Sequence, residues 1–155
     1  MKPTRLHIIF ITFAAMLMLA ACSTTKRLPE GEILYTGLKA VNFNDTLAKV
    51  PAELRSEIRE AVAVKPNNPL LGSASYRIPF PLGLWVYNNW PNPPSGLKHK
   101  IYEWLATEPI LVSDVRPEVR VEMINQILDN NGFFRGTASY DLAQKKNKRK
   151  ASIIY

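Results

Sequence analysis

The chain has 155 residues, a length that favours a single domain. Its formal net charge of +7 favours anionic partners such as lipid headgroups, whereas the absence of any base-reading motif argues against nucleic acid. Since the sequence holds one cysteine, an internal disulfide and a metal site built from several thiolates are both excluded.

Residues 1–21 have the pattern of a secretory signal peptide. Lys2 and Arg5 precede an apolar run from Leu6 to Ala21, which ends in small residues. This run is shorter than the roughly 20 apolar residues that a membrane-spanning helix needs. A short transmembrane anchor is therefore the less favoured alternative.

Leu19, Ala20, Ala21 and Cys22 resemble the lipobox of bacterial lipoprotein precursors. The resemblance implies cleavage before Cys22 and acylation of that cysteine, and two or three acyl chains hold a protein firmly because each buried methylene contributes about 0.8 kcal/mol. Residues 22–32 are expected to form the lipidated end and its tether. Because neither an aspartate nor an acidic cluster follows the cysteine, the resemblance implies the outer membrane, with the domain facing the periplasm.

The first elements expected in the mature chain are a strand and a helix. Ile33–Phe43 is rich in β-branched and aromatic residues and predicts a strand, which ends at the turn signal Asn44-Asp45. Apolar residues then recur at helical spacing, and Pro51 suits a first helical turn. The apolar face of this helix consists of Leu47, Val50, Leu54, Ile58, Ala61 and Val62.

The segment from Val64 to Gly96 is predicted to be an ordered, extended loop. Its seven prolines disfavour long regular elements, and its aromatic residues are atypical of a disordered linker. It either packs on the domain or docks a partner through Trp85, Tyr87 and Trp90. With a short helix predicted over residues 97–105, the whole insertion covers about residues 64–112.

The C-terminal part predicts a helix and a β-hairpin. The helix runs from Pro117 to about Asn130 and stops at Asn131-Gly132. The apolar period then changes to two, which predicts strands over residues 134–142 and 150–155. The basic segment Gln144–Arg149 between them is read as a solubilising turn, with contact to lipid headgroups as the alternative.

This order of elements predicts an α+β fold, in which two helices cover one face of a three-stranded sheet. It is also the layout of a POTRA module. Residues 33–155 are therefore expected to form one POTRA-like β-α-α-β-β sandwich that carries the insertion.

Five short stretches carry a resemblance to a known family: Leu28–Gly37, Lys65–Gly72, Leu84–Asn88, Glu108–Ser113 and Asn130–Phe134. They resemble the N-terminal part of the lipid-anchored TamL proteins of Bacteroidetes, in the outer-membrane insertase superfamily of BamA and TamA. The resemblance implies a periplasmic region before a membrane-embedded β-barrel, with unfolded outer-membrane proteins as clients and a TamB-like partner. Since no barrel strands are present, we expect the chain to be a fragment of a longer product or of a truncated gene.

The predicted sheet suggests how such a chain acts. An exposed edge strand accepts an extended client segment by β-augmentation, through backbone hydrogen bonds. Ile33–Phe43 and Ala151–Tyr155 are the candidate strands, and the pattern leaves open which edge is free. The alternative is a free-standing outer-membrane lipoprotein that serves as a structural or partner-binding module.

An enzyme is not expected from this sequence. His99, the one histidine after the signal segment, lies between Lys98 and Lys100, which indicates a basic surface cluster. No phosphate-binding loop, nucleophile elbow or paired-histidine motif is present. We therefore predict no catalytic residue, no metal site and no cofactor.

Asp45-Thr46-Leu47 resembles the three-residue O-glycosylation acceptor of exported Bacteroidetes proteins. Three residues match often by chance, and Thr46 is equally a candidate N-cap of the first helix. Glycosylation of Thr46 is kept as a hypothesis.

Overall fold

The computed structural model divides the chain into two compact units, which we call the sheet unit and the helical unit. Of the described residues, those within 29–77 and 109–155 form the sheet unit, and those within 24–28 and 78–108 form the helical unit. Cys22 and Thr46 lie outside the described residues, as does the signal segment. The structure describes residues 24–44, 49–90, 96–144 and 146–155.

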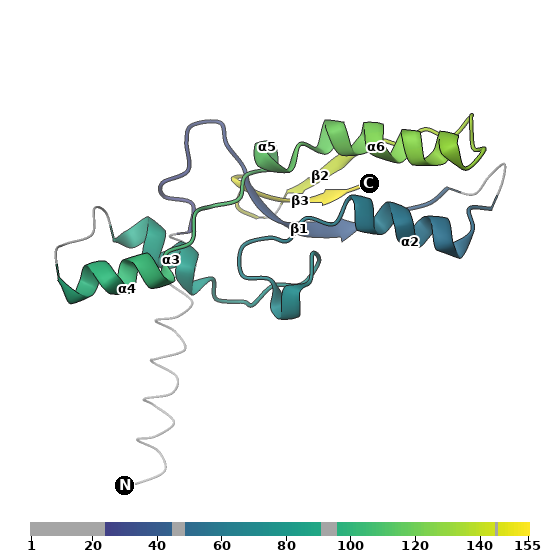
Figure 1. The fold of residues 1–155 in the computed structure, drawn as a ribbon. Coiled ribbons are helices and arrows are strands. Elements are labelled where there is room, and N and C mark those ends of the chain that lie inside the picture. The colour runs from purple at the N-terminus through teal and green to yellow at the C-terminus, as the bar shows by residue number, and fades with distance from the viewer. Residues whose placement is uncertain (1–23, 45–48, 91–95, 145) are drawn as a thin grey trace, which may run out of the picture. The chain divides into compact units, whose positions relative to one another are not determined.

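The sheet unit has the predicted α+β architecture, with three strands in the order β1-β3-β2 (Figure 1). β1 pairs with β3 in parallel, and β2 pairs with β3 in antiparallel orientation. The elements of this unit are β1 (Leu34–Ala40), α2 (Ala52–Ala61), the 3-10 helix η2 (Leu70–Gly72), α5 (Val112–Val115), α6 (Pro117–Asn130), β2 (Asp141–Gln144) and β3 (Lys150–Ile154).

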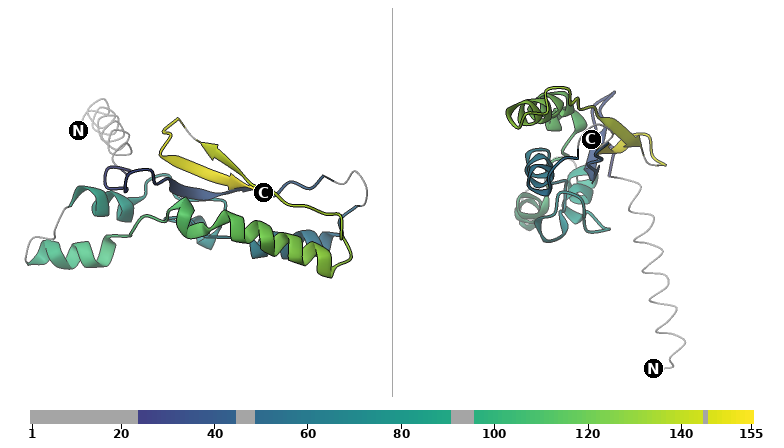
Figure 2. Two further views of the ribbon diagram at one scale, coloured as in Figure 1. Left: turned by 90° about the horizontal axis from the view of Figure 1, so that it is seen from above. Right: turned by 90° about the vertical axis from the view of Figure 1, so that its right-hand side faces the viewer.

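The core of the sheet unit lies between the sheet and the helices α2 and α6, which cover one face of it (Figure 2). Ile58 of α2 is 1% exposed, and burying such a side chain contributes about 1.5–3 kcal/mol. The apolar face predicted for α2 is confirmed at Leu54, Ile58 and Val62. The stripe predicted for α6 is buried at Ile124 and Leu128, whereas its members Val119 and Met123 are 48% and 40% exposed. The core consists of Tyr35, Leu38, Leu54, Ile58, Val62, Val115, Ile124, Leu128, Ile153 and Tyr155.

The end of α6 is a Schellman motif, as the Asn-Gly pair predicted. Gly132 has a φ of 84°, a conformation that favours glycine. Its N–H donates to the Asp129 carbonyl at 3.0 Å, and the Phe133 N–H donates to the Leu128 carbonyl at 2.9 Å. These bonds satisfy carbonyls that the last turn of the helix leaves without a partner.

The predicted strand over residues 134–142 is wrong for most of its length. β2 begins only at Asp141, although partly buried and exposed side chains alternate over residues 136–140 as predicted. The backbone there does not join the sheet, and the Ala138 N–H donates to the Asn125 side-chain oxygen at 2.7 Å. The alternating pattern therefore identified which side chains of this segment face inward. Side chains can alternate in this way without a neighbouring strand.

The helical unit holds α3 (Leu82–Asn89) and α4 (Leu97–Leu105). α4 was predicted, but α3 corrects the prediction of an extended loop over residues 64–96. Pro81 precedes α3 at its N-cap and Pro91 follows it in the sequence, so these prolines bracket the helix without interrupting it. Among the described residues, no helix is long and apolar enough to cross a membrane.

α3 and α4 contact each other where α4 ends and α3 begins. The Thr107 N–H donates to the Gly83 carbonyl at 3.2 Å. A Cβ atom on Gly83 would lie 2.4 Å from Thr107 Oγ1 and 2.6 Å from the Leu105 carbonyl oxygen. The absence of a side chain at this position therefore permits the close approach of the two segments.

Candidate functional site

The strand order decides which backbone edge of the sheet unit is open. β3 is the central strand and pairs with β1 on one side and with β2 on the other. The proposal that Ala151–Tyr155 offers a free edge is therefore wrong. A local sequence pattern does not encode strand order, because the order depends on how distant segments cross over.

β1 is at one end of the sheet, but backbone groups from other segments bind its outer side. The Tyr35 N–H donates to the Ile110 carbonyl at 2.9 Å, and the Leu38 N–H donates to the Ala74 carbonyl at 3.0 Å. In the other direction, the Val112 N–H donates to the Ile33 carbonyl at 2.9 Å. The outer edge of β1 is thus largely covered.

β2 is the open edge of the sheet. In the described parts of the chain no strand pairs with its outer side. Asp141 and Gln144 are exposed at its two ends, and Leu142 and Ala143 between them are half-buried. An unpaired edge presents backbone N–H and C=O groups to any extended chain that reaches it.

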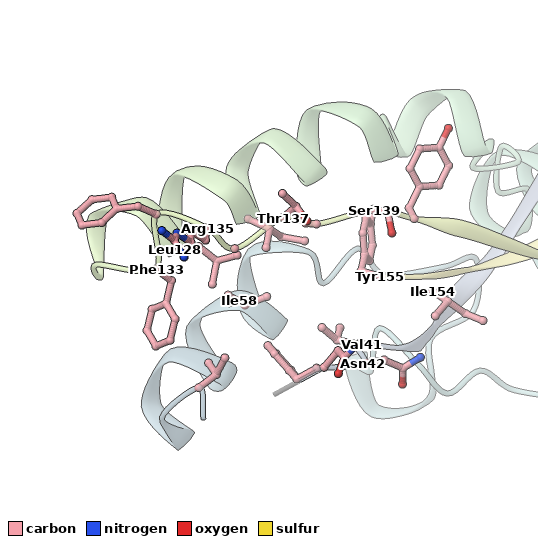
Figure 3. Close-up of a pocket in the computed structure, with 18 of the residues that line it drawn as sticks. Val41, Asn42, Ile58, Leu128, Phe133, Arg135, Thr137, Ser139, Ile154 and Tyr155 are labelled. Carbon is pink, nitrogen blue, oxygen red and sulfur yellow. The ribbon is translucent and has the colours of Figure 1, made fainter. Parts of the chain in front are cut away.

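A groove of about 850 Å³ adjoins this edge, between α2 and α6 at the end where β1 and β3 stop (Figure 3). Asp141, the first residue of β2, is one of the residues that line it. The apolar part of the lining comes from Val41, Phe43, Ile58, Leu128, Phe133 and Tyr155. The groove therefore offers an apolar surface next to an open row of backbone groups.

Tyr155 brings an unsatisfied polar atom to this groove. Its side chain is buried, at 9% exposed, and its hydroxyl has no hydrogen-bond partner among the described residues. A buried hydroxyl without a partner costs about 1–3 kcal/mol. Burial also raises the pKa of Tyr155 to about 12, so the group stays protonated and able to donate a hydrogen bond at neutral pH.

Near the groove, Tyr140 and Glu118 form a surface hydrogen bond. The Tyr140 hydroxyl donates to the Glu118 carboxylate. This bond lowers the pKa of Glu118 and raises the pKa of Tyr140. The pair ties the residue before β2 to the first turn of α6.

The predicted docking residues Trp85, Tyr87 and Trp90 are all half-buried in the helical unit. The ring of Trp85 lies 6.5 Å from that of Phe80, centroid to centroid. The sequence interpretation missed Trp104, which is 83% exposed on α4. The signal that points to Trp104 is its spacing of seven residues from Leu97.

The remaining candidates show no catalytic arrangement. His99 Nε2 lies 3.3 Å from Glu103 Oε1, one turn along the surface of α4. No cluster of three or more histidine, cysteine, aspartate or glutamate side chains suited to a metal ion occurs in the described ranges. In the basic hairpin turn, Arg149 donates to the Pro29 carbonyl at 2.8 Å, so that residue helps to fix the hairpin.

Comparisons with protein-family models, with curated proteins and with solved structures gave no match for this chain.

Proposed function

We propose that this chain is the lipid-anchored, periplasmic end of an outer-membrane protein assembly or translocation factor, and that it binds extended segments of client or partner chains by β-augmentation on β2. The open outer edge of β2 carries this proposal. The other end strand, β1, is already covered by residues 110–112 and Ala74, so a single edge is left for an added strand.

Pairing with β2 suits a factor that handles many sequences. Backbone hydrogen bonds recognise an extended chain without regard to its side chains. The groove next to Asp141 adds an apolar surface for one or two side chains of the bound segment. Outer-membrane strands alternate apolar and polar residues, so they carry side chains suited to such a groove.

Anchoring at the outer membrane rests on the sequence. The lipobox-like residues Leu19–Cys22 and the TamL-like stretches of the mature chain support it. The lipid would hold the open edge near membrane proteins that have yet to fold, which raises the effective concentration of clients at β2.

A photo-crosslinking amino acid at Gln144 tests the proposal in cells. We expect this variant to capture unfolded outer-membrane proteins or a periplasmic partner chain. Lys39 is the matched control, because it is an exposed strand residue on β1, where the outer edge is covered. Equal adducts from both positions, or none from Gln144, would contradict β-augmentation on β2.

A further inference from the structure

We infer that α4 is a membrane-surface helix, whose exposed apolar stripe inserts into the headgroup region of an anionic phospholipid bilayer. The inference rests on the proposed anchor at Cys22 for the nearness of the membrane. It concerns a different surface from the edge of β2, and a different ligand.

The first observation is the exposure of large apolar side chains on α4. Leu97 is 75% exposed and Trp104 is 83% exposed, and no residue of this helix is buried. Single exposed apolar residues are ordinary on protein surfaces. Two large ones that are seven residues apart lie one above the other on the same side of a helix.

The second observation is the arrangement of the residues around α4. At about 100° per residue, an apolar arc about 100° wide holds four side chains. Lys98 and Lys100 fall on the two flanks of this arc, and His99 and Glu103 lie on the opposite side. Of the four apolar residues, Leu97 and Trp104 are exposed, and Ile101 and Leu105 toward one edge of the stripe are half-buried.

This arrangement fits a helix that lies in the plane of a membrane surface. Flanking lysines extend their charged ends to lipid phosphates while their methylene groups cover apolar surface. Tryptophan favours the interface, since its ring is apolar and its indole N–H is a donor. Helices with an apolar face and a basic border bind anionic bilayers in this way.

The charge of the helical unit supports an anionic partner, such as a bilayer with anionic headgroups, over a neutral or basic protein. Its described residues include the acidic side chains Glu103 and Glu108, and Glu103 is engaged with His99. The basic side chains outnumber them two to one: Lys26, Arg27, Lys98 and Lys100.

Hydrogen bonds tie the residues after Cys22 to α3, within the same unit. Asn88 Nδ2 donates to the Thr24 carbonyl at 3.2 Å, and the Arg27 N–H donates to Asn88 Oδ1 at 2.9 Å. The Arg27 guanidinium also donates to the Tyr87 carbonyl at 3.0 Å. Thr24 and α3 are therefore one packed structure.

A lipid on Cys22 would be attached close to the helical unit. Cys22 precedes Thr24 by two residues, a reach of about 7 Å. An acyl chain on Cys22 would hold the helical unit at the bilayer surface, where even a weak helix–lipid interaction is favoured by the high effective concentration. α4 would then set the orientation of the anchored chain.

Tryptophan fluorescence of the full chain, purified from membranes and reconstituted into vesicles, tests this inference. The vesicles contain phosphatidylethanolamine and phosphatidylglycerol, with a fraction of the acyl chains brominated. Since the chain has three tryptophans, the Trp85→Phe/Trp90→Phe variant reports Trp104 alone. We expect bromine near the headgroups to reduce its emission by half or more, and Lys98→Glu/Lys100→Glu to weaken this quenching.

If that variant misfolds, as judged by circular dichroism, the difference in quenching between the wild type and Trp104→Phe measures the same quantity. Emission of Trp104 that aqueous iodide quenches and brominated lipid does not would overturn the inference. The charge-reversal variant serves a second purpose, because unchanged quenching would exclude the role of the two lysines.

Metabolic labelling of Cys22 with a fatty acid separates this inference from the proposed anchor. Labelled Cys22 with Trp104 unaffected by brominated lipid overturns the membrane-surface helix alone. Unlabelled Cys22 with Trp104 quenched removes the lipid anchor and supports the helix. Loss of both signals contradicts both.

Discussion

The helices of the sheet unit and those of the helical unit differ in how far they bury their apolar residues. In the sheet unit, α2 and α6 cover one face of the sheet and bury Ile58 and Ile153 almost completely. In the helical unit, α3 buries Leu84 and Val86, whereas α4 buries no residue and exposes Trp104. The sheet unit leaves backbone groups open at β2 and exposes apolar side chains outside its core, such as Leu71 and Phe134. The helical unit exposes Trp104 on a helix that buries none of its residues. The same chain thus offers two surfaces of different chemistry.

The largest expected effect comes from comparing Ile58→Ala with Trp104→Ala. Ile58 is buried between α2 and the sheet, so its truncation should lower the free energy of unfolding by about 2–5 kcal/mol. Trp104 is exposed, so its truncation should change the free energy of unfolding by no more than about 0.5 kcal/mol. Urea unfolding measures both values. Similar losses from the two variants would show that Trp104 on α4 packs as tightly as Ile58 on α2, which would contradict the difference between the two helices.

Gly37→Ala tests whether the cover on the outer edge of β1 requires the close approach of the Ala74 carbonyl to Gly37. Gly37 has a φ of 118°, and a Cβ atom there would lie 2.9 Å from the Ala74 carbonyl oxygen. That oxygen accepts the Leu38 N–H. We expect a loss of about 1–3 kcal/mol in the free energy of unfolding, because a strained conformation and a close contact coincide. Ala143→Gly, at the open edge, is the control, and a larger loss there would reverse the assignment of covered and open edges.

Asn88→Ala probes the helical unit alone. Asn88 donates to the carbonyls of Thr24 and Leu84 and accepts from the Arg27 N–H. Its loss should lower the local stability of α3 by about 1–2 kcal/mol, since buried backbone groups lose their partners. Hydrogen exchange should accelerate in α3 and residues 24–28, and remain unchanged in α6. Equal acceleration in α6 would mean that the two units do not open separately.

Tyr155→Phe should have the smallest effect at neutral pH. Because the Tyr155 hydroxyl is buried and lacks a partner among the described residues, its removal should raise the free energy of unfolding by about 1 kcal/mol, the low end of the cost of leaving it unsatisfied. Burial raises the pKa of Tyr155 to about 12, above its ordinary value of about 10. The stability from its protonated state is present below pH 10 and is lost as pH rises through 12.

Urea unfolding between pH 9 and 12 tests whether stability falls with rising pH, as the raised pKa of Tyr155 predicts. The wild type should lose stability more steeply than Tyr155→Phe, although Tyr35, whose pKa burial also raises, contributes in both proteins. Parallel pH profiles for the two proteins would show that the Tyr155 hydroxyl is hydrated in the free groove.

The predictable part of the fold is the part with a regular apolar period. The buried positions of α2 and the Asn-Gly stop of α6 follow from local spacing, and the structure confirms them. The stripe predicted for α6 is confirmed only in part, because Val119 and Met123 are exposed. The open edge at β2 could not be derived, since it depends on β3 inserting between β1 and β2. Local patterns contain no information about that order.

The helical unit was less predictable for two physical reasons. Its prolines disfavour a helix only when they fall inside it, and around α3 they fall outside. On α4, Ile101, Tyr102 and Leu105 are half-buried, whereas Trp104 is exposed. The exposed Trp104 was missed because a sequence pattern places residues on a face without showing whether another element covers that face.

Hydrogen exchange of β2, with and without a client, tests the central claim most directly. The full chain, purified from membranes into detergent micelles, is mixed with a urea-unfolded outer-membrane barrel protein that is diluted out of urea. β-Augmentation predicts that exchange of amides in β2 (residues 141–144) slows about tenfold or more, equivalent to roughly 1.4 kcal/mol, while exchange in β1 stays the same. Unchanged exchange in β2 at saturating client would contradict the account.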